Sequence, residues 1–161
     1  MARRAQGFTL IEMMVVVGVV AILALMMIPA YQDRFIRNQI LEALPLADIA
    51  KAPVAAAWAA ARALPADNAA AGLPVPEKVV NNHVSALQVE GGAIHITFGN
   101  RASNAIRGKV LSLRPAIVAD APIVPVAWVC GPGLVPGNMT AQGENRTSVP
   151  ARYLPLNCRE H

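Results

Sequence analysis

The residue whose chemistry stands out is Glu12, because it is the one charged residue in the apolar stretch from Phe8 to Ala30. A carboxylate inside an apolar membrane span costs about 3 kcal/mol on insertion scales, so it requires a partner or a function. As a helix, this stretch would be about 35 Å long, which is enough to cross the hydrocarbon core of a bilayer. The pattern therefore predicts a membrane-length helix that carries a carboxylate near its start.

The remaining residues that could do chemistry form no recognisable catalytic or metal-binding pattern. His83, His95 and His161 have no ligand spacing with Cys130 and Cys158, and no nucleophile elbow, zincin motif or phosphate-binding loop occurs. Because side chains alternate between the two faces of a strand, we expect His95 to lie on the face that points to solvent. The sequence thus predicts a protein without enzymatic activity, metal or cofactor.

Composition excludes several classes of protein. The chain has 161 residues, 55% of them hydrophobic and 15% charged, with a net charge of +4 and a mean hydropathy of +0.41. Disordered chains need low hydrophobicity, and a multi-span membrane protein needs more than one membrane-length stretch. The charge is also too small for a dedicated nucleic-acid binder. One globular domain with a membrane helix remains.

Two ordinary explanations of the N-terminus fit poorly. A secretory signal would end in a small-residue cleavage site after the apolar region, and none closes this one. A plain membrane anchor would suit the basic start at Arg3 and Arg4 but would leave Glu12 unexplained.

The start of the chain instead resembles the class III leader of type IV pilins. Gly7 is followed by Phe8-Thr-Leu-Ile-Glu12, and Pro29 stands at the end of the apolar stretch. The resemblance implies that a prepilin peptidase cuts between Gly7 and Phe8 and methylates the amine of Phe8. It also implies that Glu12 pairs with the Phe8 amine of a neighbouring subunit and so sets the register of assembly. One departure is Ala21, where the family commonly has glycine.

The resemblance divides the chain into a leader (residues 1–7), a transmembrane and filament-core helix (8–30) and a globular domain (31–161). From Arg34 to Arg62, apolar residues recur on one side of a second helical stretch. They are Ile36, Ile40, Leu44, Ala47, Val54 and Trp58. We expect kinks at Pro29 and Pro45, while Pro53 could kink the helix or end it.

Four short apolar runs predict strands in the second half of the chain. Residues 84–89 and 93–98 flank Gly91-Gly92, which suits a two-residue hairpin turn. Residues 109–117 and 123–129 supply the third and fourth runs, whereas residues 63–82 have no clear period and predict a loop that wraps the domain. The predicted fold is α+β, a long N-terminal helix packed on a four-stranded antiparallel sheet.

The C-terminal part resembles the closing segment of pilins, a loop bounded by a disulfide. Trp128-x-Cys130 and Tyr153-Leu154-Pro155-x-x-Cys158 carry this resemblance. It implies a disulfide between Cys130 and Cys158, and two free buried thiols are the alternative. A bridge over such a loop would stabilise the fold by about 3–4 kcal/mol.

Four cations follow one another along the second half of the expected sheet: Arg101, Arg107, Lys109 and Arg114. They could form a stripe that contacts DNA, as some pilins capture DNA. A solvated strand and turn explains them better, because no aromatic stacking platform accompanies them.

The predicted function is that of a structural subunit of a type IV pilus, for adhesion, twitching motility or DNA uptake. Its expected partners are other pilin subunits, the peptidase and methylase, the inner-membrane assembly machinery, the lipid bilayer before assembly and, more weakly, DNA. We expect the chain in the inner membrane before assembly and in an extracellular pilus afterwards. A minor or DNA-receptor pilin and a type II secretion pseudopilin are the alternatives.

Overall fold

The computed structural model describes residues 7–160, and of Pro29 and Ala30 only the backbone. Residues 1–6, which hold most of the predicted leader with Arg3 and Arg4, and His161 lie outside the described residues. The chain divides into two compact units, one that ends at Phe35 and one that begins at Ile36.

Helix α1 (Leu10–Ala43) supplies nearly all of the first unit. Its first two turns hold no proline and no glycine, and its apolar residues between Leu10 and Ile28 are exposed. The helical assignment continues through Pro29 without a break. The kink predicted at that proline stays a prediction.

A short 3-10 turn, η1 (Leu44–Ala47), separates α1 from α2 (Asp48–Ala61). Pro45 lies in this turn, where its missing N–H and its ring interrupt α-helical hydrogen bonding. Pro53 lies inside α2, so the helix continues past it. It ends at Arg62, which adopts the left-handed conformation with a φ of 53° and donates its N–H to the Trp58 carbonyl. That geometry caps the last turn.

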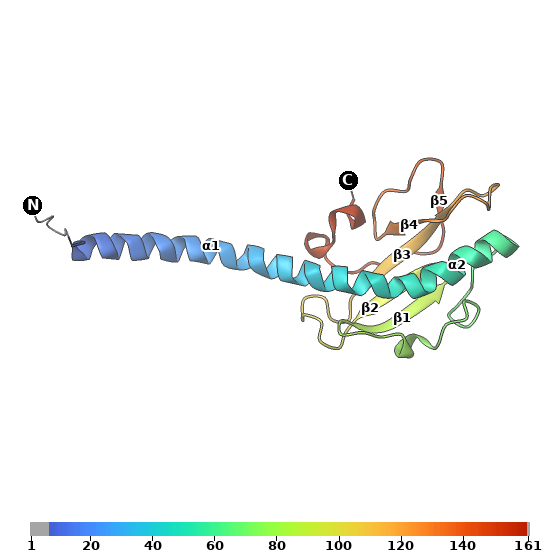
Figure 1. Cartoon of the computed structure of the whole chain (residues 1–161), viewed down its shortest axis with the longest axis horizontal. Coiled ribbons are helices and arrows are strands. Elements are labelled where there is room, and N and C mark those ends of the chain that lie inside the picture. Colours follow the sequence, from blue (N-terminus) through green and yellow to red (C-terminus); the bar gives the residue numbers. More distant parts are fainter. Residues whose placement is uncertain (1–6, 161) are drawn as a thin grey trace, which may run out of the picture. The chain divides into compact units, whose positions relative to one another are not determined.

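The second unit holds an antiparallel sheet (Figure 1) whose strands follow in the spatial order β1-β2-β3-β4. The strands are β1 (Val84–Glu90), β2 (Ala93–Phe98), β3 (Val110–Ile117), β4 (Ala127–Cys130) and the two-residue β5 (Thr140–Ala141), which pairs with β3. Gly91 and Gly92 both have positive φ, 55° and 81°. A type I′ hairpin turn requires that conformation at both central positions, so the predicted turn is confirmed.

The core lies between the sheet and the helical stretch of the second unit. The predicted apolar side is buried at Ile36, Ile40, Ala47, Val54 and Trp58. All of them except Trp58 pack in one cluster with the sheet residues that point the same way, namely Leu87, Val89, Ile94, Ile96, Phe98, Leu111 and Leu113. The α+β fold, with a long N-terminal helix and an antiparallel sheet, is therefore confirmed.

Residues 63–82 form a loop, as predicted, which includes a short 3-10 turn, η2 (Pro76–Lys78). The buried amide of Asn68 fixes this loop to the outer edge of β1. It donates to the Leu87 carbonyl at 2.9 Å and accepts from the Val89 N–H at 2.6 Å. The loop thereby covers backbone groups that an edge strand would otherwise leave unpaired.

The fourth strand begins later than the sequence predicts. The first part of the strand expected over 123–129 is absent: a turn is closed there by the Val124 N–H on the Ala121 carbonyl, and β4 starts only at Ala127. Pro122 and Pro125 explain the difference, because neither can donate a hydrogen bond to a neighbouring strand. As a result Ile123 is 91% exposed rather than part of the sheet.

Candidate functional site

The start of α1 is closed by a reciprocal set of hydrogen bonds between Thr9 and Glu12. The amide and the hydroxyl of Thr9 both donate to Oε2 of Glu12, at 2.9 and 2.8 Å. The Glu12 N–H donates in return to the Thr9 hydroxyl at 3.3 Å. Thr9 is therefore the N-cap and Glu12 the third helical residue of a capping box. The spacing of threonine and glutamate carries this signal in the sequence, although the carboxylate was interpreted there only as a partner for another subunit.

The capping box uses only part of the carboxylate. Both bonds from Thr9 end on Oε2, and within the part of the chain that the structure describes, Oε1 accepts no hydrogen bond. Glu12 is exposed, and together with Phe8, Ile11, Val15 and Val16 it lines a shallow hollow on the helix. The first turn thus presents one free carboxylate oxygen on an apolar surface.

The apolar surface of α1 has no partner within the chain. Phe8 is 81% exposed, and the large apolar side chains that follow it up to Ile28 are all exposed. One helical stretch among the described residues is long and apolar enough to cross a membrane. A soluble protein rarely exposes a contiguous apolar surface of this size, so this surface requires a bilayer or other chains.

The peptide bond between Gly7 and Phe8 lies outside regular structure. Both residues precede α1 and are exposed. A Cβ atom at Gly7 would meet no atom within 4 Å, so the fold around it does not explain why glycine is present. A small residue in an exposed, non-helical segment suits a protease that must bind the backbone closely.

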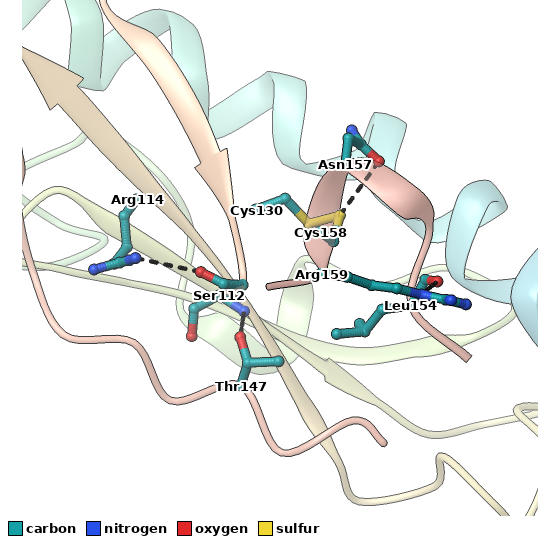
Figure 2. Close-up of a disulfide and its surroundings, with 9 residues drawn as sticks. Ser112, Arg114, Cys130, Thr147, Leu154, Asn157, Cys158 and Arg159 are labelled. Carbon is teal, nitrogen blue, oxygen red and sulfur yellow. Dashed lines mark hydrogen bonds between the residues drawn. A yellow bond between two sulfur atoms is a disulfide. The ribbon is translucent and has the colours of Figure 1, made fainter. Parts of the chain in front are cut away.

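Cys130 and Cys158 are joined by a disulfide, as the resemblance implied, and the described residues hold no free cysteine. Figure 2 shows that the bridge ties the end of β4 to the last 3-10 turn, η4 (Leu156–Cys158). Beside it, Arg159 donates to the Leu154 carbonyl at 2.8 Å. The C-terminal end is thus held to the sheet by one covalent bond and by local hydrogen bonds.

Residues 140–148, which we call the strap, pass across the side of the sheet that faces away from the core. The strap begins as β5, and further on the amide of Arg146 donates to Ser112 Oγ at 2.9 Å. The Arg146 guanidinium binds both oxygens of Glu90 and one of Glu144, which raises its pKa. These contacts fasten the strap to β1 and β3 at once.

The strap corrects the expectation that His95 faces solvent. His95 does point away from the core, but it is only 3% exposed because the strap covers it. Its Nδ1 lies 2.9 Å from Ser112 Oγ, and its buried Nε2 has no hydrogen-bond partner. Burial, with a smaller contribution from Arg146, lowers the pKa of His95. Strand alternation gave the side of the sheet correctly and could not reveal the segment that crosses it.

Known proteins resemble the chain over nearly its whole length. The pilin family of bacterial filament proteins matches residues 37–159, and the prokaryotic N-terminal methylation motif matches residues 2–28. A type IV major pilin protein of Neisseria gonorrhoeae is 33% identical over 96% of this chain and 87% of its own length. A fimbrial protein of Neisseria meningitidis serogroup B is 31% identical over 96% of this chain and 94% of its own length.

A third relative, fimbrial protein EcpC of Eikenella corrodens, is 34% identical over 96% of this chain and 90% of its own length. The chain belongs to the pilin family. Pilins are structural proteins of bacterial filaments, and the sequence of this chain shows no catalytic motif. The fold of this pilin has two prominent features, the disulfide between Cys130 and Cys158 and the exposed apolar surface of α1.

Three of the four cations of the predicted DNA stripe lie in one connection of this pilin, and the fourth lies on a strand. Arg101, Arg107 and Lys109 are exposed on the connection between β2 and β3, and Arg107 donates to the Ala102 carbonyl. Arg114 lies further along β3, is half-buried and donates to the Gly131 carbonyl. A DNA contact by these residues stays a prediction.

Proposed function

We propose that this chain is the structural subunit of a type IV pilus and that it polymerises through the segment that begins at Phe8 and continues as α1. The observation that carries the proposal is the exposed apolar surface of α1 with a carboxylate in its first turn. Membership of the pilin family supports the same function, and relatives named as major pilin and fimbrial proteins favour it over a secretion pseudopilin.

Processing precedes assembly in this proposal. A prepilin peptidase cuts the bond between Gly7 and Phe8 and methylates the new amine of Phe8. The exposed, non-helical position of both residues supports the cut, and the match to the N-terminal methylation motif spans this region. The product begins with a cationic amine one residue before the N-cap Thr9.

Glu12 then sets the register between neighbouring subunits. Its Oε1 accepts a hydrogen bond from the Phe8 ammonium of an adjacent subunit, while Oε2 keeps the capping bonds from Thr9. An isolated carboxylate or ammonium costs several kcal/mol to bury in an apolar environment, and pairing removes most of that cost. A helix that arrives out of register leaves both charges unpaired, so the pair selects one arrangement among many apolar packings.

The proposal places the chain in the inner membrane before assembly and outside the cell afterwards. The span from Phe8 to Ala30 anchors it in the bilayer, and the assembly machinery transfers it to the filament. The disulfide supports an extracytoplasmic globular domain, because disulfides persist in oxidising compartments. We assign the chain no catalytic activity.

The abundance of the chain in sheared surface filaments tests this function. Filaments are sheared from wild-type cells and from cells that lack the gene, and the protein in each fraction is identified. The proposal expects this chain to be the main component of the wild-type filaments and expects the filaments to disappear with the gene. Filaments that persist in normal amount without it would exclude the role of main subunit.

A further inference from the structure

Three arginines gather where the C-terminal turns meet the part of α1 that follows Ile36. Figure 1 shows the C-terminal segment beside this part of the helix. Arg37 donates to the carbonyl of Arg152 at 2.8 Å, and Arg159 donates to the same carbonyl at 3.0 Å. Because the two bonds share one acceptor, the two guanidinium nitrogens lie within about 6 Å of each other.

The third arginine, Arg152, is the residue whose backbone carbonyl accepts both of these bonds. Its guanidinium lies 4.6 Å from the ring centre of the buried Tyr153, in a cation–π contact. The side chain of Arg152 is exposed, whereas those of Arg37 and Arg159 are half-buried. We call Arg37, Arg152 and Arg159 the basic cluster.

The basic cluster has no anionic partner within the described part of the chain. None of the ion pairs found there includes these three residues, although the exposed Glu160 follows Arg159 directly. The buried Nε of Arg37 also has no hydrogen-bond partner. The guanidinium groups of Arg37 and Arg159 repel one another at this distance, and the fold holds them together through the neutral carbonyl of Arg152. An anion at this point would relieve the repulsion and accept hydrogen bonds from the exposed Arg152 side chain.

The position of Arg37 in the sequence indicates which anion is nearby. Arg37 follows Ala30, the end of the proposed membrane span, by seven residues of α1. Seven helical residues correspond to about 10 Å, slightly more than the depth of the head-group region of a bilayer, and a long arginine side chain reaches back over the difference. The planar guanidinium matches the oxygens of a phosphate diester through paired hydrogen bonds.

We propose that the basic cluster binds the phosphate of an anionic phospholipid while the pilin is still in the membrane. The proposal rests on the proposed function, because only a chain anchored through residues 8–30 is held beside the head groups. Binding there keeps the C-terminal turns against the bilayer surface. The contact must be released when the subunit leaves the membrane for the filament.

Lipid retention by the full-length protein tests the proposal. The protein is reconstituted in nanodiscs with equal amounts of phosphatidylglycerol and phosphatidylcholine, released, and weighed by native mass spectrometry with its bound lipids. The wild type should retain phosphatidylglycerol in preference. R37Q, R152Q and R159Q should each lower the ratio of the two lipids, by about fivefold per charge at the membrane surface.

A matched variant, R101Q/R107Q/K109Q, removes three exposed cations elsewhere on the same pilin and should keep the wild-type ratio. R152Q guards against misfolding, because among the described residues the Arg152 guanidinium lies over the Tyr153 ring and makes no hydrogen bond, and non-reducing mass mapping verifies the disulfide. R152K keeps the charge and should retain most of the preference. An unchanged ratio in all three single variants, or an equal loss in the matched variant, would overturn the proposal.

Two further arms separate the lipid from other anions and from the proposed function. A large excess of inorganic phosphate should leave the bound phosphatidylglycerol in place, and displacement would mean that the cluster binds free anions instead. A duplex DNA affinity that falls in R152Q while the lipid ratio stays constant would also refute lipid binding. E12V, which the proposed function expects to form few filaments, should keep the wild-type lipid ratio, so failures of the two proposals are distinguishable.

Discussion

Nδ1 of His95 on β2 lies 2.9 Å from the hydroxyl of Ser112, its direct neighbour on β3. The same hydroxyl accepts a hydrogen bond from the backbone N–H of Arg146, which belongs to the strap. One buried pair therefore links two strands to the segment that covers them. Because Nε2 of the imidazole is buried without a partner, this arrangement accommodates the neutral ring and disfavours the charged one.

The first prediction is that acid destabilises the fold through His95. Burial and Arg146 lower its pKa in the folded chain, while Glu90 and Glu144 oppose the shift. The unfolded chain therefore takes up this proton first as the pH falls, so the stability is complete above about pH 6.5 and declines below it. Urea unfolding of the full-length protein in detergent should show a lower midpoint at about pH 5.5 than at about pH 7.5.

H95N supplies the control for this pH dependence, because an amide can still bond to Ser112 and does not titrate. The difference between the two midpoints should shrink in H95N. An equal difference in H95N and in the wild type would mean that carboxylates, rather than His95, cause the loss of stability.

The second prediction concerns the disulfide. C130S should lower the free energy of unfolding by about 3–4 kcal/mol, because the bridge closes a loop of 28 residues and restricts the unfolded chain. Hydrogen exchange should rise most between Gly131 and Asn157. The measurement is chemical unfolding of the wild type and of C130S without reductant. Equal midpoints would show that the loop is held by its hydrogen bonds alone.

The third prediction tests the packing of the strap on the sheet. A Cβ added at Gly143 would come 2.6 Å from the Cβ of Ala93, and Gly143 has a φ of +79°. G143A should therefore cost about 1–3 kcal/mol of stability and should increase the exposure of His95. G137A is its control, since Gly137 also has a positive φ and a Cβ there meets no atom within 4 Å. A similar cost for both variants would mean that backbone conformation, and not contact with the sheet, limits position 143.

Sequence patterns predicted the elements that depend on local chemistry and missed those that depend on distant contacts. Paired glycines predicted the hairpin at Gly91 and Gly92, and the apolar side of the helix around Ile40 was read correctly. The strap has little periodicity, and its contact with His95 joins residues far apart in the chain. The spacing of Thr9 and Glu12 is also typical of a capping box, a local feature, whereas Glu12 was explained from the sequence only by a partner in another subunit.

The fourth prediction separates the two roles of Glu12. E12Q keeps the capping box, because glutamine serves equally at that position, but removes the charge. E12V removes both and should make membrane insertion easier by about 3 kcal/mol. If the carboxylate selects the register against the Phe8 amine, both variants should accumulate in the membrane and give few filaments. Filament yield in sheared fractions, relative to membrane content, is the measurement.

T9V is the matched control for E12Q, because it weakens the cap by about 1 kcal/mol and leaves the charge. The account expects T9V to assemble close to the wild-type yield. Normal filaments from E12Q together with poor filaments from T9V would assign the role of Glu12 to helix capping and would remove the intersubunit pair.

The intact mass of subunits taken from assembled filaments tests the central claim most directly. The account holds that the chain enters the filament through a helix whose first residue is a methylated Phe8. The subunit mass should therefore equal residues 8–161 with the Cys130–Cys158 bridge intact and one added methyl group. A filament subunit that still carries residues 1–7, or whose Phe8 amine is unmethylated, would contradict it.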